Sequence, residues 1–130
     1  MSIHRFTDLL GEAHRQPEPQ RLLFVMTRAE LPDHPSEAQR ADFAAGEGGV
    51  LTPVLCVDKR PDELEDMAAL AAEARETGMD WDIAFVAALS DPDGRAEVEA
   101  PLQRMVESVK RGEIDRFLAF DRQGEVVSFR

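Results

Sequence analysis

The chain has 130 residues, of which 43% are hydrophobic and 32% are charged, and its formal net charge is -11 at pH 7. This length suits a single domain, and the apolar fraction is high enough for a core, which argues against disorder. The acidic charge argues against binding to nucleic acid or to an anionic membrane. Both would repel the protein, and its lysines and arginines are scattered along the chain.

The cysteine content and the apolar runs bear on where the protein resides. Cys56 is the single cysteine, so no internal disulfide can form, which fits a reducing compartment. Asp8 and Glu12 interrupt the N-terminal region before it reaches the apolar length of a signal peptide. No run approaches the roughly 20 apolar residues of a membrane span. We therefore expect a cytoplasmic protein.

The first two predicted elements are a helix and a buried strand. Apolar residues recur at helical spacing over 3–13, and Ser2 is a candidate cap for the first turn. Pro17 and Pro19 end this helix, because proline lacks the N–H that a helix needs. The apolar block RLLFVMT (21–27) follows, and its length and proline-bounded start predict a buried strand.

A short helix and a second strand follow. Ser36 and Gln39 have the spacing of a capping box, which predicts a helix that ends before Gly-Glu-Gly-Gly (46–49). That glycine-rich stretch lacks the Lys-Ser/Thr ending of a phosphate-binding loop, so we interpret it as helix termination. Residues 50–57 are the second predicted strand, in which Pro53 indicates an irregularity or an edge position.

Another helix and strand are predicted in the middle of the chain. Pro61 suits the first position of a helix, and Gly78 suits its end. Apolar residues from Leu64 to Ala74 form the inner face of this helix. The run WDIAFVAAL (81–89) is a third, largely buried strand.

The C-terminal third contains a turn, a helix and a predicted hairpin. SDPDG (90–94) is a turn by composition, and an apolar stripe over 98–109 predicts a helix. The segments 114–120 and 126–129 flank Asp-Arg-Gln-Gly, a loop with Gly124 where a positive φ is wanted. We expect a terminal β-hairpin.

The predicted order is α-β-α-β-α-β-α-β-β in one α/β domain over 1–130. Strands that alternate with helices are typical of crossover connections and a parallel sheet. We therefore expect a mixed sheet of about five strands, mostly parallel, with an antiparallel last strand and helices packed on it.

Four segments carry a resemblance to a known family: RLLFVMTRAELP (21–32), LTPVLCVDKRPDEL (51–64), MDWDIAFVAAL (79–89) and LQRMVESVKRGEIDRFLAFDRQGEVVSF (102–129). They resemble small bacterial proteins that genomes label "ribonucleotide reductase subunit alpha". The resemblance covers most of the chain and implies a small α/β protein. That reductase uses a radical cysteine and a redox pair of further cysteines. Because this chain has one cysteine, none of the catalytic residues can be placed on it.

The reactive side chains of the sequence do not form a recognisable catalytic set. Cys56 lies between Leu55 and Val57 in a strand pattern, which favours an inert core residue over a nucleophile. A metal site would need the three histidines, His4, His14 and His34, to converge from separate positions. HExxH, CxxC and GxSxG are absent, and we expect no cofactor and no metal.

Charged residues at the predicted strand ends form the one candidate ligand site. Arg28 follows the first strand, and Asp58, Lys59 and Arg60 follow the second. If these strands were parallel, the residues would meet at one edge of the sheet, where ligands bind in open α/β proteins. An anionic metabolite could then use this cationic rim. The alternative is that strand ends emerge into water and are charged for that reason.

Two functions remain open at this point. One is a non-enzymatic accessory or interaction protein, with a homodimer or a protein partner. Its support is a last strand that reaches Phe129 with no covering segment after it. The other is a small-molecule or enzymatic site at the strand ends. A third reading, a redox-sensing Cys56, requires a thiol that reacts rapidly in the native protein.

Overall fold

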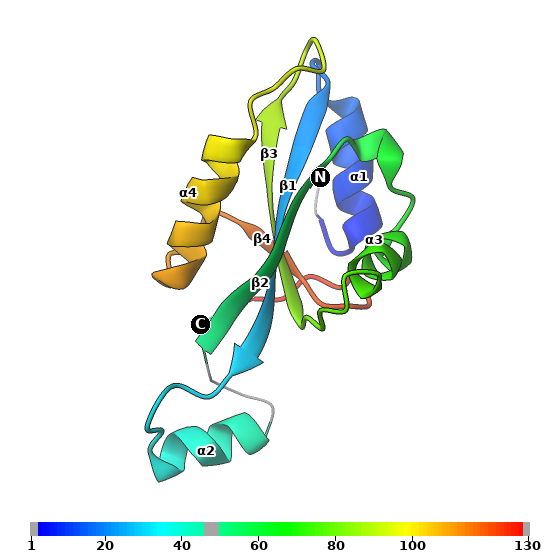
Figure 1. Cartoon of the computed structure of the whole chain (residues 1–130). Helices are drawn as coiled ribbons and strands as arrows, with labels where there is room; N and C mark the ends of the chain where they lie inside the picture. The colour runs from blue at the N-terminus through cyan, green and yellow to red at the C-terminus, as the bar shows by residue number, and fades with distance from the viewer. Residues whose placement is uncertain (1–2, 46–49, 129–130) are drawn as a thin grey trace.

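The computed structural model describes residues 3–45 and 50–128, which form an α/β fold (Figure 1). The helices are α1 (Phe6–Arg15), α2 (Glu37–Ala44), the single-turn 3₁₀ helix η1 (Pro61–Glu63), α3 (Met67–Arg75) and α4 (Glu99–Lys110). The strands are β1 (Gln20–Glu30), β2 (Val50–Lys59), β3 (Ile83–Ser90) and β4 (Leu118–Phe120).

The four strands form one sheet in the order β2-β1-β3-β4, and every neighbouring pair is antiparallel. The prediction of a mostly parallel sheet of five strands is therefore wrong for the described residues. The reason lies in α2, which the alternation of helices and strands predicts to be a crossover helix. It buries no residue and lies away from the sheet, so β1 and β2 are joined as a long hairpin (Figure 1).

β2 is an edge strand, and the prediction for Pro53 is confirmed. The register of β1 and β2 shifts between Met26 and Thr27, where Val54 is the extra residue on β2. Pro53 lies opposite Thr27. The Thr27 carbonyl accepts from the Asp82 N–H at 2.7 Å, so the backbone N–H and C=O of Thr27 point toward β3. The β1–β2 ladder therefore needs no N–H from Pro53, which has none.

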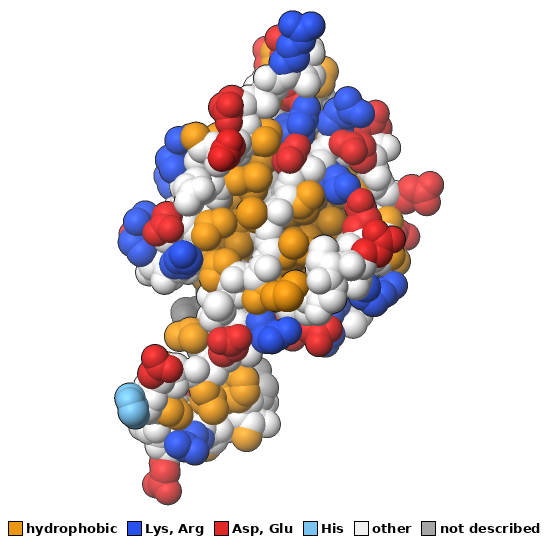
Figure 2. Space-filling model, viewed as in Figure 1, with side chains coloured by type: hydrophobic (Ala, Val, Ile, Leu, Met, Phe, Trp, Pro, Cys, Tyr) orange, Lys and Arg blue, Asp and Glu red, His pale blue; other side chains and the backbone are white. Residues whose placement is uncertain are grey.

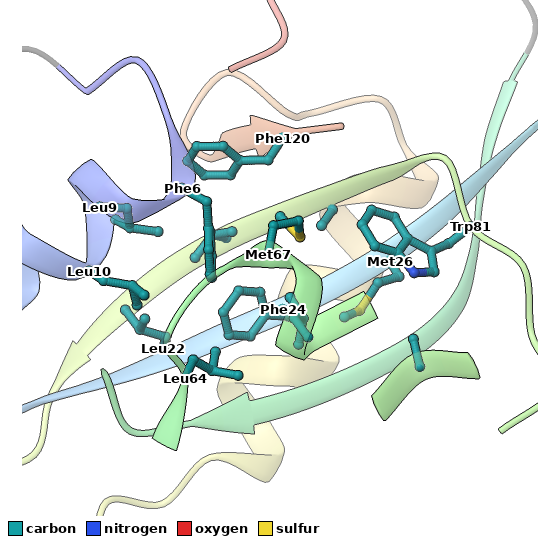
Figure 3. Close-up of a cluster of buried hydrophobic side chains, with 14 of the residues drawn as sticks. Phe6, Leu9, Leu10, Leu22, Phe24, Met26, Leu64, Met67, Trp81 and Phe120 are labelled. Atoms are coloured by element: carbon teal, nitrogen blue, oxygen red, sulfur yellow. The ribbon is translucent and has the colours of Figure 1, made fainter. Parts of the chain in front are cut away.

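Alternate residues of the strands build a core on each face of the sheet. On one face, α1 and α3 cover the larger cluster, which Figure 3 shows around Phe6, Phe24 and Phe120. The rings of Phe6 and Phe120 meet edge to face, with centroids 5.5 Å apart. On the other face, α4 packs Met105 and Val109 against Leu23, Val25 and Phe85.

The predicted helix from Pro61 to Gly78 is broken into η1 and α3. Leu64 is buried in extended conformation between them, and Asp66 then caps α3 by accepting from the Ala69 N–H at 2.9 Å. Because Asp66 caps the first turn of α3, α3 starts as a separate helix. The buried, extended Leu64 keeps the chain from continuing as one helix between η1 and α3. By contrast, the Ser36 capping box of α2 is confirmed.

The two ends of the described chain pair with each other. β4 is shorter than the predicted strand over 114–120, and beyond it the described residues form only isolated bridges, such as Phe120 with Val126. The Val126 N–H donates to the His4 carbonyl at 3.1 Å, so the N-terminal segment covers this part of the C-terminal one. The predicted open C-terminal edge is therefore wrong at Glu125 and Val126. Ser2, Phe129 and the glycine stretch 46–49 lie outside the described residues.

Candidate functional site

The antiparallel sheet separates the four residues that the sequence singled out. Arg28 pairs in register with Thr52, near one end of the β1–β2 hairpin. Asp58 and Lys59 pair with Leu23 and Leu22, at the opposite end. Strand ends meet at one edge only when the strands are parallel. Asp58, Lys59 and Arg60 therefore lie together, and Arg28 lies apart from them.

Asp58 belongs to an ion-pair network centred on Arg21. The Arg21 guanidinium donates to the Asp58 carboxylate at 2.8 Å and to the Asp91 carboxylate at 2.9 Å, and also reaches the Gly94 carbonyl at 3.1 Å. The second Asp91 oxygen accepts from the Ala96 N–H at 2.9 Å. The network joins the start of β1, the end of β2 and the loop before α4.

Two members of this network are largely buried. The side chain of Asp91 is 1% exposed and that of Arg21 is 14% exposed. The hydrogen bond that Arg21 donates to the Asp58 carboxylate raises the pKa of Arg21 above its usual value, and Asp91 adds to the effect. Arg21 is not predicted from the sequence, because it opens an apolar block, and the composition of SDPDG (90–94) predicts only a turn at Asp91. A charged residue at the first position of a buried strand was the available signal.

Lys59 and Arg60 have carboxylate partners of their own. Lys59 Nζ lies 2.6 Å from Glu73 on α3, and Arg60 lies 3.6 Å from Glu63 and 3.7 Å from Asp62. The Lys59 side chain is largely buried, whereas that of Arg60 is 55% exposed. Arg60 is therefore the most exposed of the three rim residues that lie together.

Arg60 lines a cleft of about 550 Å³ between the end of α1, η1 and the loop after β3. His14 and Arg60 supply basic groups there, while Glu18 and Asp62 supply acidic ones. Four prolines also line the cleft, at positions 17, 19, 61 and 92. A cleft of this volume can hold a small molecule. Its mixed charges do not select an anion as clearly as the predicted rim would.

Cys56 is exposed, which corrects the prediction of a buried core thiol. It pairs in register with Val25, so it points to the face that α4 covers, but at the sheet edge the cover is incomplete. Successive side chains of a strand point to opposite faces, so Cys56 can be exposed on one face while its neighbours in the strand pack on the other. No hydrogen bond or ion pair joins the thiol to another described residue.

The free edge of β2 is flanked by apolar side chains. Leu55 and Val57 pack partly buried on the face of α1 and α3, and Leu51, with Leu102 and Val106 of α4, lies on the other face. Figure 2 shows hydrophobic side chains on both sides of the white backbone that crosses the middle of the view, where Figure 1 places β2. An open edge with apolar flanks is a surface suited to a further strand.

Within the described residues, no group of three or more His, Cys, Asp and Glu side chains is arranged to hold a metal ion. The described helices are also too short and too polar to cross a bilayer. Comparisons of the chain with protein-family models, curated proteins and solved structures found no match.

Proposed function

We propose that this protein is a non-enzymatic interaction module whose contact surface is the outer edge of β2. The carrying observation is that β2 ends the sheet with apolar side chains on both of its faces and nothing paired to its outer side in the described chain. Monomeric proteins usually cover or interrupt such an edge, because it pairs with other chains. In β2, Pro53 and the bulge at Val54 interrupt the first half of the edge, and the stretch from Leu55 to Lys59 stays regular. The exposed thiol of Cys56 fits a cytoplasmic location, where thiols stay reduced.

Cys56 offers a direct test, because it lies in the middle of this edge. We expect the native thiol to react with a polyethylene-glycol maleimide at a rate close to that of the unfolded chain. The labelled and unlabelled proteins are then used to capture partners from the native host. Proteins identified by mass spectrometry on the unlabelled form should be lost on the labelled form.

The control is Cys56→Ser, which is taken through the same maleimide treatment and keeps an open edge. It should capture the same partners as the unlabelled protein. If the labelled protein retains every partner, the interaction surface lies elsewhere and the proposal fails.

The resemblance to the proteins labelled "ribonucleotide reductase subunit alpha" stays a prediction. It leads to a specific question, since an accessory protein of that reductase would bind one of its subunits. The same capture experiment answers it. Recovery of a reductase subunit that depends on the free β2 edge would support the link, and its absence would count against it.

A small-molecule site is the second candidate, and the cleft beside Arg60 favours it over the dispersed rim. A thermal-shift screen with anionic metabolites tests it. A ligand of the cleft should raise the melting temperature of the native protein and of Arg28→Ala, because Arg28 lies at the other end of the hairpin. The shift should be lost in Arg60→Ala. If no metabolite raises the melting temperature, this candidate is withdrawn.

A further inference from the structure

The outward backbone groups of β2 follow from the register of the hairpin. A strand residue points its N–H and C=O to the same side, and successive residues alternate. Since the backbone groups of Thr27 point to β3, those of Met26 and Phe24 point to β2, where they pair with the backbone groups of Leu55 and Val57. Cys56 and Asp58 are therefore turned outward. None of the backbone hydrogen bonds found outside the ladders involves residues 51–58.

The side chains beside these outward groups differ between the two faces. On the α4 face, Cys56 is exposed, and Leu102 and Val106 of α4 are partly buried. Toward α3, Leu55 and Val57 are partly buried, and the Lys59–Glu73 ion pair shows that α3 lies beside the end of β2. An added strand would turn one set of alternate side chains to each of these faces.

The charge on the α3 side is strongly acidic. Residues 60–76 contain six carboxylates and two arginines, and Glu73 is half exposed despite its partner Lys59. Figure 2 shows red side chains over the region where Figure 1 draws α3. A segment with lysine or arginine on this face would be attracted, and one with glutamate would be repelled.

A second copy of the chain fits this edge poorly. Each copy has a net charge of -11, so two copies repel each other. Pro53 and the bulge at Val54 remove a regular ladder from half of the strand, a feature that discourages pairing of identical edges. The regular stretch runs only from Leu55 to Lys59, which is enough for a short segment from another protein.

We propose that β2 takes an extended, basic segment of another protein as an added strand along Leu55–Lys59. The segment pairs with the outward N–H and C=O groups of Cys56 and Asp58. It turns apolar side chains to α4 and lysine or arginine to α3. This rests on the proposed function and adds to it the chemistry and the pairing mode of the partner.

The test uses an acetylated peptide of about eight residues with alternating valine and lysine, a length that forms one strand. Two control peptides are matched to it. In one, glutamate replaces lysine. In the other, every second backbone nitrogen carries a methyl group, so that the side chains stay and the donors on one edge are lost. Residue-resolved amide exchange measured by NMR reports where each peptide binds.

We expect the valine–lysine peptide to slow exchange at the amides of Cys56 and Asp58 at least about tenfold, because they become hydrogen-bonded. The amides of Leu55 and Val57 should be slow with and without peptide. The glutamate peptide should bind at least about tenfold more weakly, and the methylated peptide should not protect these amides. Cys56→Arg should weaken binding of the lysine peptide, while Cys56→Ser should not.

Three results would overturn the inference. The first is no protection of Cys56 and Asp58 by the valine–lysine peptide. The second is equal binding of the glutamate peptide. The third is concentration-dependent protection of the same amides without peptide, which would make a second copy the occupant. If partner capture still depends on the free edge while the peptide fails, the proposed function stands and only the added basic strand is rejected.

Discussion

Asp91 shows how strongly the surroundings of a residue decide its role in this protein. It lies in a turn of polar composition, yet its side chain is 1% exposed because Arg21 and the Ala96 N–H satisfy its oxygens. Cys56 is the opposite case, an apolar-type residue in a strand that is left exposed at the sheet edge. Burial here follows from the available partners and from the position in the sheet, and residue type alone is a weak guide to it.

At the residue scale, Gly124 offers a prediction with a matched control. Gly124 and Gly94 have φ values of +83° and +73°, and alanine at either position is strained by about 1–2 kcal/mol. A Cβ at Gly124 would also lie 3.1 Å from Met67 Cβ, whereas nothing lies within 4 Å of one at Gly94. We therefore expect Gly124→Ala to lower the free energy of unfolding by about 1–3 kcal/mol more than Gly94→Ala does. Urea denaturation measures both, and equal losses would contradict the close packing at Gly124.

At the element scale, α2 and α3 have similar lengths and similar caps but different surroundings. α2 has a complete capping box at Ser36 and buries no residue, whereas α3 buries Met67, Leu70 and Ala74. Isolated helices of this length are marginal in water, so α2 depends on its cap, while α3 depends on packing. The contrast predicts different consequences of removing each cap.

We expect Ser36→Ala to destabilise α2 by about 1 kcal/mol and to leave the melting temperature of the sheet unchanged. Amide exchange over Glu37–Ala44 should become faster, since the Gln39 N–H loses its acceptor at 3.1 Å. Asp66→Ala is the control, because it removes the cap of a helix that packs on the core and should lower the melting temperature. A fall in melting temperature for Ser36→Ala would mean that α2 contributes to the main fold.

At the scale of the whole molecule, the Arg21 network connects segments that are far apart in sequence. It joins residue 21 to residues 58 and 91, and the Asp91 N–H also donates to the Pro19 carbonyl at 2.7 Å. A buried ion pair adds little net stability when it is intact. Removal of one partner is costly, because it leaves a buried charge without compensation.

Arg21→Met should therefore lower the free energy of unfolding by about 3–5 kcal/mol. Arg28→Met is the control, since Arg28 lies on the same strand with no ion pair found among the described residues, and a surface change of this kind stays within about 0.5 kcal/mol. Denaturation by urea at pH 7 checks both. Adding Asp91→Asn to Arg21→Met should recover part of the lost free energy of unfolding. If the losses of the two single variants simply add in the double variant, the coupling of Arg21 and Asp91 is contradicted.

Much of the local structure could be predicted from local signals. The block RLLFVMT is inside β1, the Ser36 capping box starts α2, and Gly124 has the positive φ that its loop requires. Pro53 lies both at the sheet edge and beside a bulge. Each of these depends on backbone geometry and near neighbours in the chain, which the sequence contains directly.

The direction of the strands could not be predicted in the same way. Alternation of helix and strand is shared by parallel crossovers and by antiparallel hairpins with an inserted helix, and only packing distinguishes them. Because α2 buries nothing, β2 returns antiparallel beside β1, and Arg28 is separated from Lys59. The predicted rim therefore does not form. The same antiparallel pairing brings Arg21 to its partners Asp58 and Asp91.

The sequence by itself determined the apolar strands, the caps, the turn glycines and the acidic charge, since these depend on residue type and on short spacing. Only the tertiary structure decided the antiparallel order, the burial of Asp91, the exposure of Cys56 and the open edge of β2. These features arise from contacts between segments tens of residues apart. Many pairings are compatible with the same local pattern, and the packing of α1, α3 and α4 on the two faces selects one of them.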